Sequence, residues 1–151
     1  MTEGQAPIQA PIKVDKTNML KAGKIPVIAA AIGGALWLLG GLGGIMGILF
    51  WVIAVFAGYW YVDQVLKSGA KPTILDVIVN GAILGAVVGL VYAVVTWIAI
   101  SIRFPGIAGL AYRWGFGSIR RVMLEGAIGG AIGADRKRVG EGKRVDIGGR
   151  R

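Results

Sequence analysis

The sequence predicts an all-α integral membrane protein made of a helical hairpin, one long transmembrane helix and a fourth membrane segment that is amphipathic and glycine-rich. Hydrophobic residues make up 55% of the 151 residues and charged residues only 17%, which is typical of a chain surrounded by lipid. Two uncharged runs, 25–62 and 77–102, are each longer than the roughly 20 residues that cross a bilayer. Many of the 26 glycines lie in apolar stretches, where a missing side chain lets helices pack closely.

The N-terminal residues 1–18 are expected to form a disordered leader, because they contain Pro7 and Pro11 and show no sustained apolar periodicity. The apolar run that follows is longer than the roughly 7–15 residues of a signal-peptide h-region, so we expect it to stay in the mature protein. A single membrane domain is then predicted over residues 19–134.

The run 25–62 must fold back on itself, since as one helix it would be about 57 Å long against a hydrocarbon core of ~30 Å. The most easily broken place is 40–44, where glycine occupies every position except 42. We therefore predict a hairpin of helices near 22–39 and 45–65. The aromatic cluster 59–61 then lies at the end of the second helix, which suits a membrane interface.

A third helix is predicted over residues 73–103. Thr73 and Asp76 have the spacing of a helix N-cap and an acid at the third helical position. Arg103 and Pro105 mark the other end. The uncharged stretch between them spans a bilayer with some tilt.

The acids beside the loop that precedes this helix have ordinary electrostatic explanations. Asp63 can pair with Lys67 at i,i+4, and Asp76 suits a helix N-terminus, so we do not interpret the two acids as an intramembrane aspartyl site. Asn80, Thr96 and Ser101 are expected to form hydrogen bonds within or between helices.

Glycines at four-residue spacing predict close helix packing. Gly81, Gly85 and Gly89 share one face of the third helix, and the partner helix can come from the same chain or from another copy. Gly126 and Gly130 repeat the spacing. Residues 81–86 and 126–131 also resemble each other, either because a two-helix unit is duplicated, as in many transporters, or because both are simply rich in Gly, Ala and Ile.

The segment 106–134 has two possible arrangements. Arg113, Arg120 and Arg121 fall on one helical side, which suits a helix lying in the interface. Alternatively, the segment crosses the membrane with Arg121 paired to Glu125, although each arginine near the centre costs about 2.5–3.5 kcal/mol. Because the termini are both basic, the positive-inside rule places both in the cytoplasm, which requires an even number of crossings. Either residues 105–134 make a fourth crossing, or the first hairpin dips into the membrane without crossing separately. We favour four membrane segments.

The tail 135–151 is expected to be basic and disordered, and to contact anionic lipid headgroups of the bilayer. Nucleic acid is a weaker candidate partner, because the tail has no aromatic residues on which bases could stack. The predicted lipid-contacting residues are Arg136, Lys137, Arg138, Lys143 and Arg144.

The chain has no cysteine and no histidine, which removes thiolate sites, the commonest general base and the commonest metal ligand. We therefore expect no catalysis, cofactor or metal.

The expected function is that of a non-catalytic multi-pass protein of the cytoplasmic membrane, either a homo-oligomer or an accessory or structural subunit of a larger membrane complex. One alternative is a small pore or channel, since holin-like lysis proteins are similar in size, span number and basic tail. A small transporter is a third, but it needs a polar site at mid-membrane.

Overall fold

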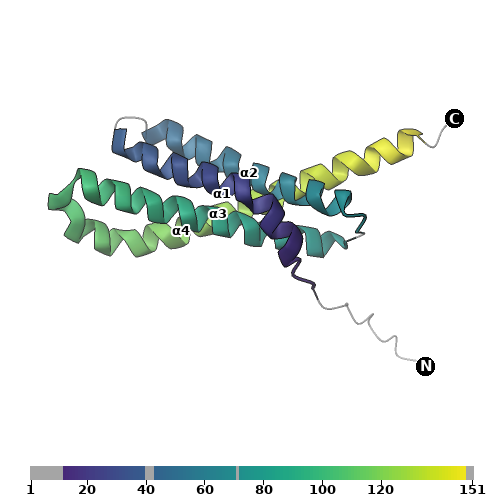
Figure 1. Ribbon diagram of the computed structural model, residues 1–151, viewed down its shortest axis with the longest axis horizontal. Helices are drawn as coiled ribbons and strands as arrows, with labels where there is room; N and C mark the ends of the chain where they lie inside the picture. Colours follow the sequence, from purple (N-terminus) through teal and green to yellow (C-terminus); the bar gives the residue numbers. More distant parts are fainter. Residues whose placement is uncertain (1–11, 40–42, 71, 149–151) are drawn as a thin grey trace, which may run out of the picture.

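Four α-helices form the described part of the computed structural model, which covers residues 12–39, 43–70 and 72–148 (Figure 1). For residues 43, 44, 46, 107–117 and 141–148 it describes the backbone alone. The helices are α1 (Lys16–Ala35), α2 (Gly43–Lys67), α3 (Ile74–Arg103) and α4 (Ala108–Gly148), with short 3-10 turns at Leu36–Leu39 and Pro105–Ile107. The predicted all-α class is confirmed for these residues.

Local capping explains where α1 and α3 begin. The Asp15 side chain accepts a hydrogen bond from the backbone nitrogen of Asn18 at 3.0 Å, so α1 begins at Lys16 and not near residue 22. The predicted cap of α3 is confirmed, because the Thr73 hydroxyl accepts from the Asp76 nitrogen at 3.1 Å and the Asp76 carboxylate accepts from the Thr73 nitrogen at 3.3 Å.

The chain reverses between α1 and α2. Residues 40–42 of the predicted turn lie outside the described residues, and α2 begins at Gly43. At this end of the bundle the Trp37 indole donates to the Tyr92 hydroxyl at 3.2 Å, and the Arg103 guanidinium donates to the Leu38 carbonyl. The 3-10 turn that follows α1 is therefore tied to α3.

The helix α4 continues past its predicted end at residue 134 to Gly148, so the described part of the predicted disordered tail is helical. Residues 149–151 lie outside the described residues. No proline follows Pro105, and Arg136, Lys137 and Arg138 have good helix propensity. The charged composition that suggested disorder is compatible with a helix that other helices hold at one end.

The helix directions alternate along the chain (Figure 1). α3 packs against the other three helices, and so does α2, which puts these two helices at the centre of the bundle. The first residues of α1 and α3 and the last residues of α2 lie at one end, which we call the terminal end, and α4 leaves the bundle there too. The opposite end, with the 3-10 turns Leu36–Leu39 and Pro105–Ile107, is the far end.

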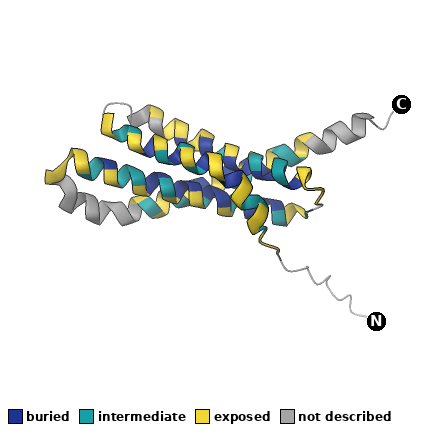
Figure 2. Ribbon diagram, in the orientation of Figure 1, coloured by how far each residue is buried: buried dark blue, intermediate teal, exposed yellow. Residues whose placement is uncertain are grey.

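The core of the described residues is made of alanine, of branched aliphatic side chains such as Val65, Val77 and Val88, and of the aromatic residues Phe50, Tyr61 and Tyr92 (Figure 2). The rings of Phe50 and Tyr92 lie 4.9 Å apart between α2 and α3. Three helices are long and apolar enough to cross a membrane, by length and composition: Lys16–Leu39, Gly47–Lys67 and Ile74–Arg103.

The glycines of α3 face α4 of the same chain. A β-carbon added at Gly81 would lie 2.8 Å from the Gly130 carbonyl oxygen, and one added at Gly85 would overlap the Gly126 carbonyl oxygen. One added at Gly89 would lie 2.6 Å from the carbonyl oxygen of Val122. The similar segments 81–86 and 126–131 thus pack against each other, and their likeness has a packing reason.

A second side of α4 packs equally closely against α2. A β-carbon at Gly58 would overlap the Gly130 carbonyl oxygen, and one at Gly133 would overlap the Val55 carbonyl oxygen. One at Gly129 would lie 2.9 Å from the Ala54 β-carbon. We call this space between α2 and α3 the α4 slot; it fixes both the depth and the rotation of α4.

Candidate functional site

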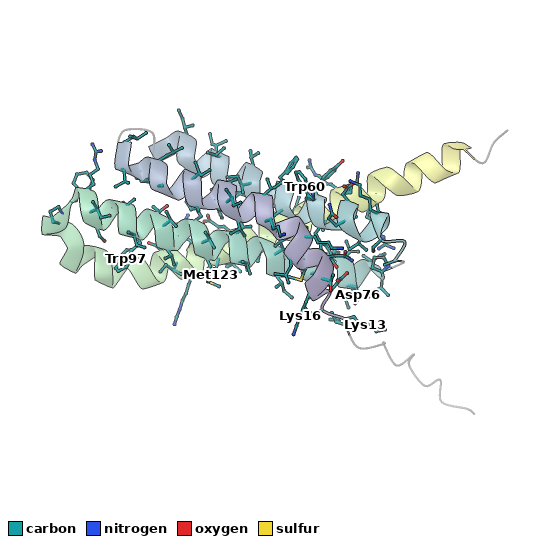
Figure 3. The ribbon with its side chains drawn as sticks, in the orientation of Figure 1. Lys13, Lys16, Trp60, Asp76, Trp97 and Met123 are labelled. Atoms are coloured by element: carbon teal, nitrogen blue, oxygen red, sulfur yellow. The ribbon has the colours of Figure 1, made fainter. Side chains whose placement is uncertain are left out.

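Charged side chains lie on α4 at half the length of the bundle. Gly89 stands midway along α3, and it meets Val122 of α4. Arg120 and Arg121 are one or two residues away, which is about 1.5–3 Å along a helix axis. Met123, labelled in Figure 3, marks this level near the middle of the bundle. We call Arg120, Arg121 and Glu125 the mid-bundle charged cluster.

The two arginines of this cluster belong to the side of α4 that no other helix covers, and Glu125, whose side chain is 29% exposed, lies at its edge. Gly126 and Gly130 point to α3, while Gly129 and Gly133 point to α2. The opposite side is exposed: Leu124 is 63% exposed, Ile128 46% and Ile132 42%, and both arginines are exposed as well. We call this side the α4 outer face; it consists of Arg120, Arg121, Leu124, Ile128 and Ile132.

The cluster carries one more positive than negative charge. The Arg121 guanidinium donates from Nε to a Glu125 carboxylate oxygen at 2.8 Å, which confirms the predicted i,i+4 pair. The Arg121 side chain nevertheless remains 81% exposed. Among the side chains that the structure describes, Arg120 has no ion-pair partner. The arrangement can bind a carboxylate or another anion from outside the chain.

A second polar region lies at the terminal end. Asn80 is completely buried, and its amide donates to the carbonyl oxygens of Lys13 at 2.9 Å and Asp76 at 2.7 Å. Its side-chain oxygen accepts from the Asp15 nitrogen at 3.0 Å. Residues 13–15, which the sequence analysis assigned to a disordered leader, are thereby fixed to α3. Their order comes from contacts with residues far along the chain.

A cavity of about 370 Å³ opens beside these residues, lined in part by Asp15, Tyr61, Asp76 and Asn80. The carboxylates already accept hydrogen bonds from the chain itself: Asp15 from Asn18, and Asp76 from Thr73 and Lys13. In the described residues, no three His, Cys, Asp or Glu side chains gather in a way that could hold a metal ion. The polar groups at this cavity anchor residues 13–15 to α3, and their hydrogen bonds are used for that purpose.

The other predicted acid, Asp63, is also engaged. One carboxylate oxygen lies 2.7 Å from the Lys67 ammonium, which confirms the predicted i,i+4 pair, and the other lies 3.6 Å from the Lys137 ammonium. Lys137 also donates to the Tyr59 hydroxyl at 3.1 Å and sits 4.5 Å from the centre of that ring. These contacts join α4 to α2.

The residues predicted to contact lipid headgroups lie in different surroundings. Lys137 points into the bundle, with its side chain only 15% exposed. Arg138 lines a cavity of about 170 Å³ near the loop residues Ala70 and Pro72. Arg136 is exposed to the surroundings. The side chains of Lys143 and Arg144 lie outside the described residues, although their backbone is part of α4.

The sequence pattern predicts Arg120 and Arg121 on one side of a helix but does not identify them as a site. The missed signal is the spacing of Gly126, Gly129, Gly130 and Gly133. Such spacing puts glycines on two adjoining sides of one helix, which indicates a helix held between two others with one side left over. The arginines belong to that remaining side.

Comparison with protein-family models, with curated proteins and with solved structures found no match.

Proposed function

We propose that the protein is a non-catalytic membrane protein whose copies associate through the α4 outer face, with all four helices crossing the cytoplasmic membrane. The observation that carries this proposal is the position of the mid-bundle charged cluster, which is exposed at half the length of three apolar helices. Close-packed glycine faces form the inside of each copy and fix the outer face of α4 for contact with another.

The membrane placement follows from the packing of α4. α1, α2 and α3 have the length and composition of membrane spans. Because α4 runs beside α3 through Gly126 and Gly130, inserting the first three helices carries α4 into the bilayer with them. Trp60 toward the terminal end and Trp97 toward the far end suit the two interfaces (Figure 3).

The orientation follows from the basic residues. Lys13, Lys16, Lys67, Arg136 and Arg138 all belong to segments at or near the terminal end. The positive-inside rule then places this end, and with it both termini, in the cytoplasm. Four crossings agree with the first residues of α1 and the last residues of α4 lying at the same end (Figure 1).

An outer face that meets only lipid is unfavourable in this placement, because an arginine at the bilayer centre costs about 2.5–3.5 kcal/mol on insertion scales. A second copy removes the cluster from lipid. Around a two-fold axis along the membrane normal, the two α4 helices lie side by side and point the same way. Arg121 of each copy then lies near Glu125 of the other, and Leu124, Ile128 and Ile132 provide apolar contact.

Disulfide crosslinking of single-cysteine variants tests the interface, since the native chain has no cysteine. We expect Leu124→Cys to form a crosslinked dimer in native membranes under mild oxidation, because this residue lies at the centre of the outer face. Ile28→Cys is the matched control: Ile28 is 59% exposed, but on α1. Crosslinking of Ile28→Cys but not of Leu124→Cys would refute the proposed interface.

Charge exchange tests the pairing. Arg121→Glu gives each copy two acids on this face, and Glu125→Arg gives each copy three arginines, so either variant alone should lose the Leu124→Cys crosslink through repulsion. Coexpression of the two variants should restore a crosslink between unlike chains. Loss in both single variants without restoration would contradict reciprocal pairing.

A pore is the second candidate, favoured by the unpaired charge of Arg120 among the described side chains. Several outer faces around a water-filled lumen would solvate the arginines and favour anions. In that arrangement Leu124→Cys reacts with a water-soluble thiol reagent, and liposomes containing the protein release chloride. In the closed dimer Leu124→Cys is protected and the liposomes stay tight.

A further inference from the structure

A groove separates α1 from α3 on the outside of the bundle. Its volume is about 530 Å³, within the roughly 300–1,000 Å³ of typical ligand pockets. Its walls are almost entirely apolar and include Leu20, Gly23 and Val27 from α1 and Ile83, Leu84 and Val87 from α3. Gly23 brings the two helices together, since a β-carbon there would lie 2.9 Å from a methyl carbon of Leu84. We call this the α1–α3 groove.

Two lysines border this apolar groove. Lys16 and Lys24 both line it, eight residues apart on α1, which is about 12 Å along a helix axis. Both residues are exposed, and among the described side chains neither has an ion-pair partner. The nearby acids Asp15 and Asp76 accept hydrogen bonds from other groups of the chain. Figure 3 shows Lys16 at the terminal end of the bundle.

We propose that the α1–α3 groove binds one anionic phospholipid, with its phosphate between Lys16 and Lys24 and an acyl chain along the apolar walls. Lysine stems reach along apolar surface toward the membrane interface. Lys24 can therefore extend toward the terminal end, where Lys16 lies at the start of α1. Val27 and Val87 lie deeper in the bundle than either lysine and provide apolar contact for the chain. Basic pockets between membrane helices on the cytoplasmic side favour such headgroups.

The charge and the walls together select this occupant. A zwitterionic lipid would fill the same walls but would leave the two ammonium groups without a net anion. An inorganic phosphate would pair with the lysines but would leave the walls unfilled. The inference rests on the membrane placement proposed above, but not on the α4 outer face, which belongs to another helix.

Lipid retention of the full chain tests the site. The protein is extracted into mild detergent with equal amounts of dioleoyl phosphatidylglycerol and dioleoyl phosphatidylcholine, and retained lipids are counted by native mass spectrometry. We expect one phosphatidylglycerol to be retained in preference. The double variant Lys16→Gln/Lys24→Gln should bind it about 30-fold more weakly, and each single variant about fivefold more weakly.

Lys21→Gln is the matched control, because Lys21 is an exposed lysine of the same helix that does not line the groove. It should leave retention unchanged. Val87→Trp keeps all charges and fills the groove, so it should also reduce retention while circular dichroism shows an unchanged helix content. Millimolar inorganic phosphate should not displace the lipid.

Three results would overturn the proposal: equal retention of the two lipids by the native chain, unchanged retention in the double variant, or an equal loss in Lys21→Gln. Displacement by phosphate would also count against an acyl-chain site. The Leu124→Cys crosslink, measured with the native lysines and on the double variant, separates the two proposals. Its absence in the chain with native lysines, while that chain still retains phosphatidylglycerol, would refute the dimer interface alone. Its presence in the double variant together with lost lipid preference supports two independent sites.

Discussion

Asn80 illustrates how one buried side chain can set the start of a helix in another part of the chain. It is completely buried, and its hydrogen bonds reach Lys13 and Asp15 as well as its own helix. Buried amides of this kind are stabilising only when their partners are all present. The hydrogen bonds therefore hold residues 13–15 in place, and Asp15 in turn caps α1.

Replacing Asn80 should loosen the N-terminal segment first. Asn80→Leu leaves the Asp15 nitrogen and the Lys13 carbonyl without their partner, so we expect a loss of about 1–3 kcal/mol in the free energy of unfolding. Trypsin should also cleave after Lys13 and Lys16 faster than in the native protein. Ser101→Ala is the control, because the Ser101 hydroxyl only donates to the Trp97 carbonyl in its own helix. Equal trypsin sensitivity of the two variants would contradict the tether.

Lys137 provides a second tether, between α4 and α2. Its ammonium lies near the Tyr59 ring and hydroxyl and near Asp63, while its side chain is only 15% exposed. The Lys137 ammonium is thus engaged by α2, while its predicted contact with anionic headgroups stays a prediction. Arg136, the preceding residue, is exposed and free of this constraint.

Replacing Lys137 or Arg136 by alanine should therefore change the free energy of unfolding by different amounts. Lys137→Ala removes a hydrogen bond, a cation–π contact and a charge pair, and we expect a loss of about 1–2 kcal/mol in stability. Arg136→Ala should change stability by less than about 0.5 kcal/mol. Thermal unfolding in detergent, followed by circular dichroism, distinguishes the two. A larger loss in Arg136→Ala would show that Lys137 is not the tether.

At the scale of the element, the packing of α4 depends on glycines, which have no β-carbon. Its glycines meet backbone atoms of α2 on one side and of α3 on the other, so α4 fits its slot only without β-carbons at these positions. Where the helix leaves the slot, the requirement ends: a β-carbon added at Gly140 would meet nothing within 4 Å. A glycine-to-alanine substitution should therefore lower stability inside the slot and raise it where α4 has left the slot.

Glycine-to-alanine substitutions in α4 test this difference. Gly130→Ala puts a methyl group into the Gly81 carbonyl of α3, so we expect α4 to shift and stability to fall by about 3 kcal/mol or more. Gly140→Ala should raise stability by about 0.5–1 kcal/mol, because alanine is the better helix former. Unfolding of both variants in detergent provides the comparison. Two variants of equal stability would mean that α4 does not lie in the slot.

At the scale of the whole molecule, the sequence predicted structure that depends on neighbouring residues, but it did not predict structure that depends on contacts between residues far apart in the chain. The Thr73 cap and the pair of Arg121 with Glu125 depend on neighbours three or four residues away, and both are confirmed. The anchoring of residues 13–15 depends on Asn80, more than 60 residues away, and could not be predicted from local patterns. The mid-bundle position of Arg120 required the α4 slot, which three separate helices form together.

The crossing number is the property of the whole molecule that matters most for the proposed function. If α4 lay flat in the interface, the mid-bundle charged cluster would meet headgroups and would need no second copy. Packing of Gly126 and Gly130 against α3 instead takes the cluster to half the length of the bundle. A measurement of the membrane topology therefore tests whether the charged cluster lies inside the bilayer, which the proposed interface requires, without any crosslink.

Single cysteines at Ile12, Gly106 and Gly140 distinguish the two topologies, because the native chain contributes no thiol background. Ile12 and Gly140 belong to the segments that leave the terminal end, and Gly106 lies in the turn at the far end. With four crossings, a membrane-impermeant maleimide added to intact cells should label only Gly106→Cys. Ile12→Cys and Gly140→Cys should react only after permeabilisation, because the proposed orientation places both of these segments in the cytoplasm. Labelling of Gly140→Cys together with Gly106→Cys from outside would mean three crossings, and the arginines would then lie at an interface.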